Sequence, residues 1–347
     1  MGHPPVRDGP RAAVGAAVPD PLRRARVSLR GARARHRVRR LRRPPAPRRR
    51  GEAAIRRAER VPVLAPISRA PVRRNHGGHD RTPLVLGVLT VVAAVVYLRG
   101  ARARRGWPAW RTALFLLGLV ALIASLASPI DSVALELFSV HMVQHMLLLV
   151  VAAPLLLLGA PVRPLLRGLP MGLRRTVVGG IARNTAFRGL VHLLRFPLVA
   201  AALYVVGLYA WHIPALYDAA LEHPAIHVVE HAWFLVTALL FWSVVIDPVP
   251  FRATLPYAAR IPFLLLVGAA QNTILGGLLA FSDRLFYVHY ATTTAAYGLD
   301  PVTDQRLGGA IMWIPGDLIF FAAASFSFFL WLQSEEQAQH MRESRQR

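Results

Sequence analysis

The hydrophobic positions of the chain gather into long apolar segments, which follow an N-terminal stretch of polar and charged residues. Seven segments after residue 82 are long and apolar enough to be interpreted as membrane-spanning helices. We place them at 83–98, 109–127, 132–159, 196–211, 225–246, 261–281 and 309–332. The pattern therefore predicts an all-α fold: a polytopic membrane protein with a seven-helix domain at 83–333 and a short tail at 334–347.

Charge alternates between the loops of this domain. Arginines gather in the loops after the first, third and fifth segments and in the C-terminal tail, whereas the other loops carry mostly acidic residues. Loops on the cytoplasmic side of a membrane are enriched in arginine and lysine. We therefore expect a cytoplasmic C-terminus and, with seven spans, an N-terminus outside. The long loop 160–195 mixes leucines and arginines at helical spacing, and we expect an amphipathic segment on the cytoplasmic face.

Residues 1–82 consist largely of arginine, proline, alanine and glycine, without any apolar period. Such a composition cannot form a core, so this segment is expected to be disordered. It is either a basic tail that contacts anionic lipid or nucleic acid, or the product of a misassigned start codon. We favour the second interpretation, because so basic a tail conflicts with an N-terminus outside. Membrane lipid is an expected partner, and nucleic acid is not.

Composition narrows the chemistry that the chain can perform. There is no cysteine, which excludes disulfides and thiolate metal sites. Histidine and methionine remain as ligands for a soft or borderline metal. The sequence contains neither a GxSxG nucleophile motif nor a phosphate-binding loop. We therefore do not expect an enzyme.

Histidines recur at helical spacing inside the apolar segments. His141 and His145 lie four residues apart in the third segment, so both side chains leave the same face of a helix. Met142 and Met146 repeat this spacing on the adjacent stripe. Ionisable groups are costly to place inside a membrane and mark a functional site by default. We therefore predict a metal site here, with the two methionines as weaker candidate ligands.

A second set of histidines lies where the fourth segment ends and the fifth begins. His212 ends the fourth segment, and His223, His227 and His231 recur every four residues. Glu230 follows His227 by three residues and is placed to accept the second N–H of its ring. The predicted topology puts both sets of histidines in the outer half of the bilayer. We therefore expect the two sets to converge on one site.

Three functions fit these histidines. Neutral imidazole suits copper, zinc, iron and nickel, and thioether sulfur adds a preference for Cu(I), so copper is the favoured ligand. Haem is the alternative, held by one histidine from each of two facing helices. A proton-coupled transporter is the third. Asp317, which follows Pro315 in the seventh segment, is interpreted as a partner of a ligand, a proton site or a helix contact.

Four motifs in order carry a family resemblance: HMVQHMLL with APLLLLGAP, then WHIPALYDAAL, HVVEHAWFL and DQRLGGAIMWIPGD. They resemble the CtaG family of cytochrome c oxidase assembly factors, of the polytopic seven-helix kind. The resemblance implies assembly of a haem–copper oxidase in a bacterial plasma membrane through copper supply, with oxidase subunits as partners. It singles out His141, His145, His212, His227 and His231, with Asp304 and Asp317 in the last motif; His223 lies outside the family pattern.

Overall fold

The computed structural model describes residues 82–247 and 250–346, and among these residues the regular elements are helices. The predicted N-terminal tail lies outside the described residues. The longer helices are α2 (Thr82–Arg102), α3 (Ala109–Leu126), α5 (Phe138–Met146), α10 (Thr185–Leu194), α11 (Pro197–Trp211), α12 (Pro214–Glu222), α13 (Pro224–Val245), α15 (Ala270–Ala280) and α16 (Pro301–Gln346). The shorter ones are α4 (Pro129–Ala134), α6 (Ala153–Leu158), α7 (Val162–Gly168), α8 (Met171–Leu173), α9 (Gly179–Arg183) and α14 (Tyr257–Phe263). Wider or tighter turns form the π-helices η1 (Leu147–Ala152), η2 (Arg174–Val178) and η3 (Leu264–Ala269) and the 3₁₀ helices η4 (Val288–Ala291) and η5 (Thr294–Tyr297).

The described residues contain six helical segments that are long and apolar enough to cross a membrane. They are Pro83–Arg102, Ala109–Leu126, Phe138–Leu158, Pro224–Val245, Tyr257–Ala280 and Pro301–Gln346. The predicted fourth span is α11, which has only 15 residues. It reaches spanning length only together with α10, and the two helices are bent by 66°. The count is therefore six, or seven if this pair forms one span, and the orientation of the termini stays a prediction.

The apolar faces of these helices agree with a multi-pass membrane protein. Leu84, Val88 and Val92 of α2 are all more than half exposed. A contiguous apolar face of this kind is unfavourable in water and is covered by hydrocarbon in a bilayer. Glycine lets α2 and α7 approach closely, because a Cβ atom at Gly100 or Gly168 would clash with the backbone of the other helix.

The predicted third span is not one continuous helix. α4 ends at Ala134, Leu137 has extended backbone angles, and α5 begins only at Phe138. Asp304 of α16 caps this second start: its carboxylate accepts the N–H of Phe138 at 2.6 Å and the N–H and hydroxyl of Ser139 at 3.2 and 2.5 Å. A distant acid thus fills the role that a preceding polar residue usually has at a helix N-terminus. The break sets where the helix with the HMVQH motif begins.

After the start of α5 at Phe138, α5, η1 and α6 follow one another as one continuous helical rod. Pro154 has no N–H to return to the preceding turn, and the turns of η1 that lead into it are widened into a π-helix. The indole of Trp242 in α13 donates to the carbonyl of Leu149 at 2.8 Å. This bond joins the rod to α13, so the two histidine-bearing helices are fixed side by side.

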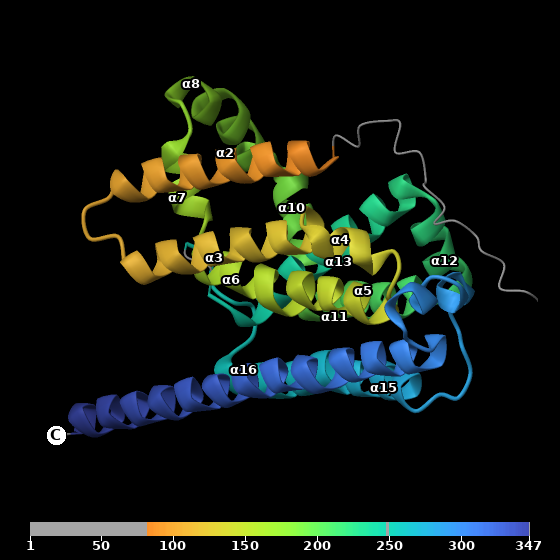
Figure 1. Cartoon of the computed structure of the whole chain (residues 1–347). Coiled ribbons are helices and arrows are strands. Elements are labelled where there is room, and N and C mark those ends of the chain that lie inside the picture. Colours follow the sequence, from red (N-terminus) through yellow and green to blue (C-terminus); the bar gives the residue numbers. More distant parts are fainter. Residues whose placement is uncertain (1–81, 248–249, 347) are drawn as a thin grey trace, which may run out of the picture. The chain divides into compact units, whose positions relative to one another are not determined.

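The remaining helices enclose this pair. In both views α15 runs along α16 (Figure 1), and α11 lies beside α13. The main hydrophobic core includes Met142, Phe234, Phe241 and Phe320, which come from α5, α13 and α16. A smaller core joins α2 to α3, where the ring of Tyr97 stacks on another aromatic ring.

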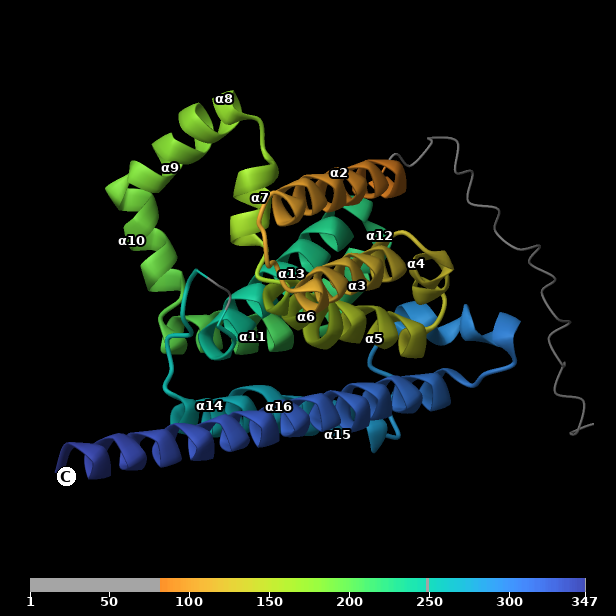
Figure 2. The ribbon, with the colours of Figure 1, turned by 90° about the vertical axis from the view of Figure 1, so that its left-hand side faces the viewer.

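The predicted amphipathic loop at 160–195 is a chain of short helices, α7 to α10 (Figure 2). Apolar side chains on α10 are exposed. The contact of this loop with a membrane face stays a prediction. The predicted C-terminal tail is helical as well, since α16 continues through Gln346 without interruption.

Candidate metal centre

The first turns of α5 and α13 bring four potential ligands together. They are His141 and His145 of α5 with Glu230 and His231 of α13, and all four are buried. One ligand atom from each can be chosen so that all four lie within 4.8 Å of one another. The Nε2 atoms of His141 and His145 are 2.8 Å apart, so one ring donates a hydrogen bond to the other.

Glu230 points across to α5 rather than along its own helix. Its carboxylate oxygens lie 3.9 Å from Nε2 of His141 and 3.7 Å from Nε2 of His145. The expectation that Glu230 orients His227 through a hydrogen bond is therefore wrong, since neither carboxylate oxygen has a hydrogen-bond partner. The packing of α13 against α5 explains this, because it brings the Glu230 carboxylate next to the two α5 imidazoles.

Several polar atoms of the cluster lack a hydrogen-bond partner. Among the buried atoms of this kind are Nδ1 of His145, Nε2 of His231 and both carboxylate oxygens of Glu230. An unpartnered carboxylate in an apolar interior costs several kcal/mol. A bound cation would offset that cost and use the nitrogen lone pairs, so these residues fit a metal ion.

A hydrogen-bond network sets the proton on His141. Tyr290 of η4 donates its one hydroxyl proton to the carbonyl of Ala134 at 2.9 Å. Its oxygen must then accept from Nδ1–H of His141, 3.2 Å away. Burial raises the pKa of the Tyr290 phenol well above its ordinary value, so the hydroxyl keeps its proton. His141 therefore carries its proton on Nδ1 and presents the Nε2 lone pair to the cluster.

His212 is prepared in the same way from a third element. It stands at the end of α11, and its Nδ1 lies 2.7 Å from the carbonyl of Leu208. A carbonyl only accepts, so Nδ1 donates and Nε2 keeps a lone pair, which has no partner. The ring is 6.3 Å from that of His145, and His212 is not one of the four closest ligands.

His227 belongs to a neighbouring group of ligands. Its ring is 4.1 Å from that of His231 and 5.5 Å from that of His141. Ligand atoms of His227, His231 and Asp131 also lie within 4.8 Å of one another. The structure thus gathers all five predicted histidines in one place and divides them into an inner and an outer part.

Five weaker predictions fall outside both groups. His223 is exposed at the junction of α12 and α13. Met142 and Met146 pack in the hydrophobic core, against Gly308 and Gly316 of α16. Asp304 caps α5, and Asp317 accepts a hydrogen bond from Thr273 of α15 at 2.5 Å. The two methionine side chains are thus turned toward α16, while His141 and His145, each one position earlier, face α13.

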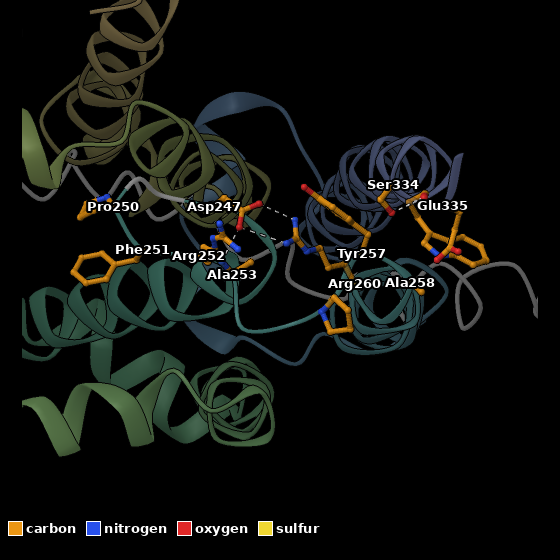
Figure 3. A pocket seen from close by; sticks show the side chains of 12 residues that line it. Asp247, Pro250, Phe251, Arg252, Ala253, Tyr257, Ala258, Arg260, Ser334 and Glu335 are labelled. Atoms are coloured by element: carbon orange, nitrogen blue, oxygen red, sulfur yellow. Dashed lines mark hydrogen bonds and ion pairs between the residues drawn. The ribbon is translucent and has the colours of Figure 1, made fainter. Parts of the chain in front are cut away.

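A cavity of about 780 Å³ lies elsewhere, between the loop after α13 and the helices α14 and α16. Figure 3 shows Asp247 and Arg260 paired in its wall; their closest atoms are 3.2 Å apart. Arg260 also stands over the ring of Tyr257, 4.2 Å from its centroid. The principal charges of this wall satisfy each other, in contrast to those of the histidine cluster.

Comparison with known protein families gives a match over most of the chain. The family model of the cytochrome c oxidase caa3 assembly factor matches residues 92–334. The chain belongs to this family. The matched region includes every residue of the candidate metal centre and most of the described helices.

The curated relatives that match this family member are mycobacterial. Uncharacterized proteins of Mycobacterium bovis and Mycobacterium tuberculosis are each 32% identical to it over 243 residues, which is 66% of the chain and 36% of the relative. One of Mycobacterium leprae is 30% identical over 247 residues, with 68% and 36% covered. The chain thus spans about a third of the length of these curated relatives. No solved structure matches it.

Sequence reasoning missed two contributors to the site of this family member. They are Asp131 and Tyr290, which fixes the tautomer of His141. Asp131 lies in α4, the short helix directly before α5, and Tyr290 lies in η4, far from the histidine motifs in the sequence. The acid at the start of a short helix gives a weak signal, and a tyrosine in a loop between spans gives none.

Proposed function

We propose that this chain assists the assembly of a cytochrome c oxidase by binding a copper ion in the histidine cluster and passing it to an oxidase subunit. The observation that carries the proposal is the convergence of His141, His145, Glu230 and His231 in a buried site with unpartnered ligand atoms. The family description supports the link to cytochrome c oxidase. The ion is cargo, so the proposed role is assembly and not catalysis.

The ligand chemistry favours a divalent ion. Three imidazoles and one carboxylate form the inner group, and such nitrogen and oxygen ligands suit Cu(II) or Zn(II). The sulfur atoms that would favour Cu(I) belong to Met142 and Met146, which pack toward α16. We therefore propose Cu(II) as the bound form.

Position supports delivery from outside. The ligands lie in the first turns of α5 and α13, and the charge pattern of the loops predicts that these turns face away from the cytoplasm. Copper that arrives from outside a bacterial plasma membrane would meet this end of the bundle first. The oxidase subunit that receives it would dock on the same side.

Haem is the competing ligand. The rings of His141 and His231 come from facing helices, with centroids 6.1 Å apart. Phe234 packs 4.6 Å from His145, and Tyr217 packs 5.1 Å from His141. A macrocycle would have to displace these aromatic rings, whereas a single ion would not. Packing therefore favours the ion.

The test is metal analysis of the full chain purified in detergent. We expect about one copper per chain after exposure to Cu(II), and an affinity at least tenfold lower in the variant His141→Ala with His145→Ala. His192→Ala is the matched control, because His192 is exposed on α10. A stoichiometric Soret band would favour haem. Copper binding at wild-type affinity in the double variant would overturn the proposal.

A further inference from the structure

The histidine cluster contains two overlapping sets of ligands. The inner group consists of His141, His145, Glu230 and His231, and the outer group consists of Asp131, His227 and His231. Within each group the ligand atoms lie within 4.8 Å of one another. His231 is the one residue that the two groups share. A single binding site would need only one of these two sets of ligands.

Burial increases from the outer group to the inner one. All four inner ligands are buried, whereas Asp131 and His227 are partly exposed. His227 lies one turn before His231 on α13, closer to the start of that helix. An ion that approaches from the start of α13 therefore meets the outer group before the inner one.

Asp131 is held beside the cluster by α5. The side-chain amide of Gln144 donates to Asp131 at 2.7 Å and to the carbonyl of Ser125 at 2.9 Å. Gln144 precedes His145 directly, so the same helix turn positions the outer carboxylate and an inner imidazole. The spacing between the two groups is thus built into α5.

The outer imidazoles are also unpartnered. Nε2 of His227 and Nε2 of His231 are buried atoms without a hydrogen-bond partner. A neutral imidazole offers one lone pair, so His231 cannot bind an ion in each group at the same time. The two groups are therefore alternative positions for one ion.

We propose that a divalent copper ion binds first at the outer group and moves to the inner group while it stays bound to His231. This inference rests on the proposed function, since the ion is the same cargo. In the step, the bonds from the ion to Asp131 and His227 break as bonds to His141, His145 and Glu230 form. The imidazoles act as neutral bases, and the ligand exchange transfers no electron.

The test separates the rate of uptake from the final affinity. Cu(II) is mixed rapidly with the full chain in detergent, and binding is followed by stopped-flow absorbance and by equilibrium titration. For Asp131→Asn, we expect uptake to slow at least tenfold while the equilibrium affinity stays within about threefold of wild type. His227→Ala should act in the same direction. Glu136→Gln is the matched control, because Glu136 is an exposed acid at the same end of α5.

A trapping variant tests the outer position directly. In His141→Ala with His145→Ala, the outer group keeps its ligands. Cu(II) should therefore still bind, but with an affinity at least tenfold lower than in wild type. Adding Asp131→Asn should abolish that residual binding. Wild-type uptake rates in both Asp131→Asn and His227→Ala would overturn this inference while leaving the proposed function intact. Absence of copper from the wild-type chain would overturn both.

Discussion

The histidine cluster and Asp304 of α16 both place buried polar groups in an apolar bundle, but they differ in whether the buried carboxylate oxygens have hydrogen-bond partners. Asp304 has both oxygens engaged, by the backbone N–H groups and the hydroxyl at the start of α5. Glu230 is as deeply buried, and neither of its oxygens has a partner. The hydrogen-bonding capacity of Asp304 is used within the protein, and that of Glu230 is not.

This difference separates a structural acid from a candidate ligand. Both residues are acidic, both lie in helices of the same bundle, and the family resemblance singled out Asp304 rather than Glu230. Residue type and depth alone would therefore rank them wrongly. Buried polar groups in folded proteins are nearly always hydrogen-bonded, so a buried carboxylate without a partner is the more informative of the two.

The largest expected effect comes from removing the structural acid. Asp304→Ala leaves the N–H groups of Phe138 and Ser139 without an acceptor in a buried setting, which should destabilise the fold by about 3 kcal/mol. Thermal unfolding of the detergent-purified chain, followed by circular dichroism, measures this. Metal binding should also weaken, because α5 carries two of the three inner histidines.

A second acid of α16 serves as the matched control for Asp304. Asp317 accepts one hydrogen bond, from Thr273, and its other oxygen has no partner. Asp317→Asn keeps an oxygen that can accept that bond, so the melting temperature should change by much less than in Asp304→Ala. Equal losses of stability in the two variants would show that Asp304 is not a special cap.

Glu230→Gln should have the opposite pattern. The amide keeps the shape of the side chain but removes an unpartnered buried charge, so the metal-free chain should be as stable as wild type or more stable. Affinity for Cu(II) should fall about 100-fold, or about 2.7 kcal/mol, because an anionic ligand is lost. Titration and thermal unfolding with and without copper give both numbers.

The combination is what tests the comparison with Asp304. If Glu230→Gln destabilises the metal-free chain and leaves copper affinity unchanged, Glu230 is a structural acid like Asp304. The reference for this measurement is the wild-type chain from which a chelator has removed copper, since bound copper itself raises the stability of the folded state.

The apolar periods of the sequence were sufficient to predict an all-helical membrane protein, because a spanning helix needs only length and composition. They were not sufficient to predict the break between α4 and α5. That break depends on Asp304, which is 166 positions from Phe138 in the chain. Local patterns carry no information about a cap that comes from another helix. The apolar pattern at 196–211 likewise predicts a span of its own, whereas α11 reaches spanning length only together with α10.

The histidines of the site could be predicted for a similar physical reason. The four-residue spacing of pairs such as His141 and His145 places both side chains on one face of a helix. Ionisable residues are costly inside a membrane and therefore indicate a functional site. Which atoms remain unpartnered could not be predicted. The direction of Glu230, the contact of Asp131 with Gln144 and the bond from His141 to Tyr290 all depend on how separate helices pack against one another.

The smallest expected effect concerns that last contact. Tyr290→Phe removes the oxygen that accepts from Nδ1 of His141, so the ring loses the constraint that directs its Nε2 lone pair into the cluster. Loss of such a partner typically weakens metal binding by about tenfold or more, and we expect about tenfold here. Tyr297→Phe is the matched control, because its hydroxyl contacts an exposed acid, Glu136, at 2.7 Å. The decisive readout is the copper spectrum: a reoriented His141 should change the nitrogen couplings in electron paramagnetic resonance, whereas a simple loss of stability would not. Unchanged couplings together with unchanged affinity would mean that His141 does not need Tyr290 to act as a ligand.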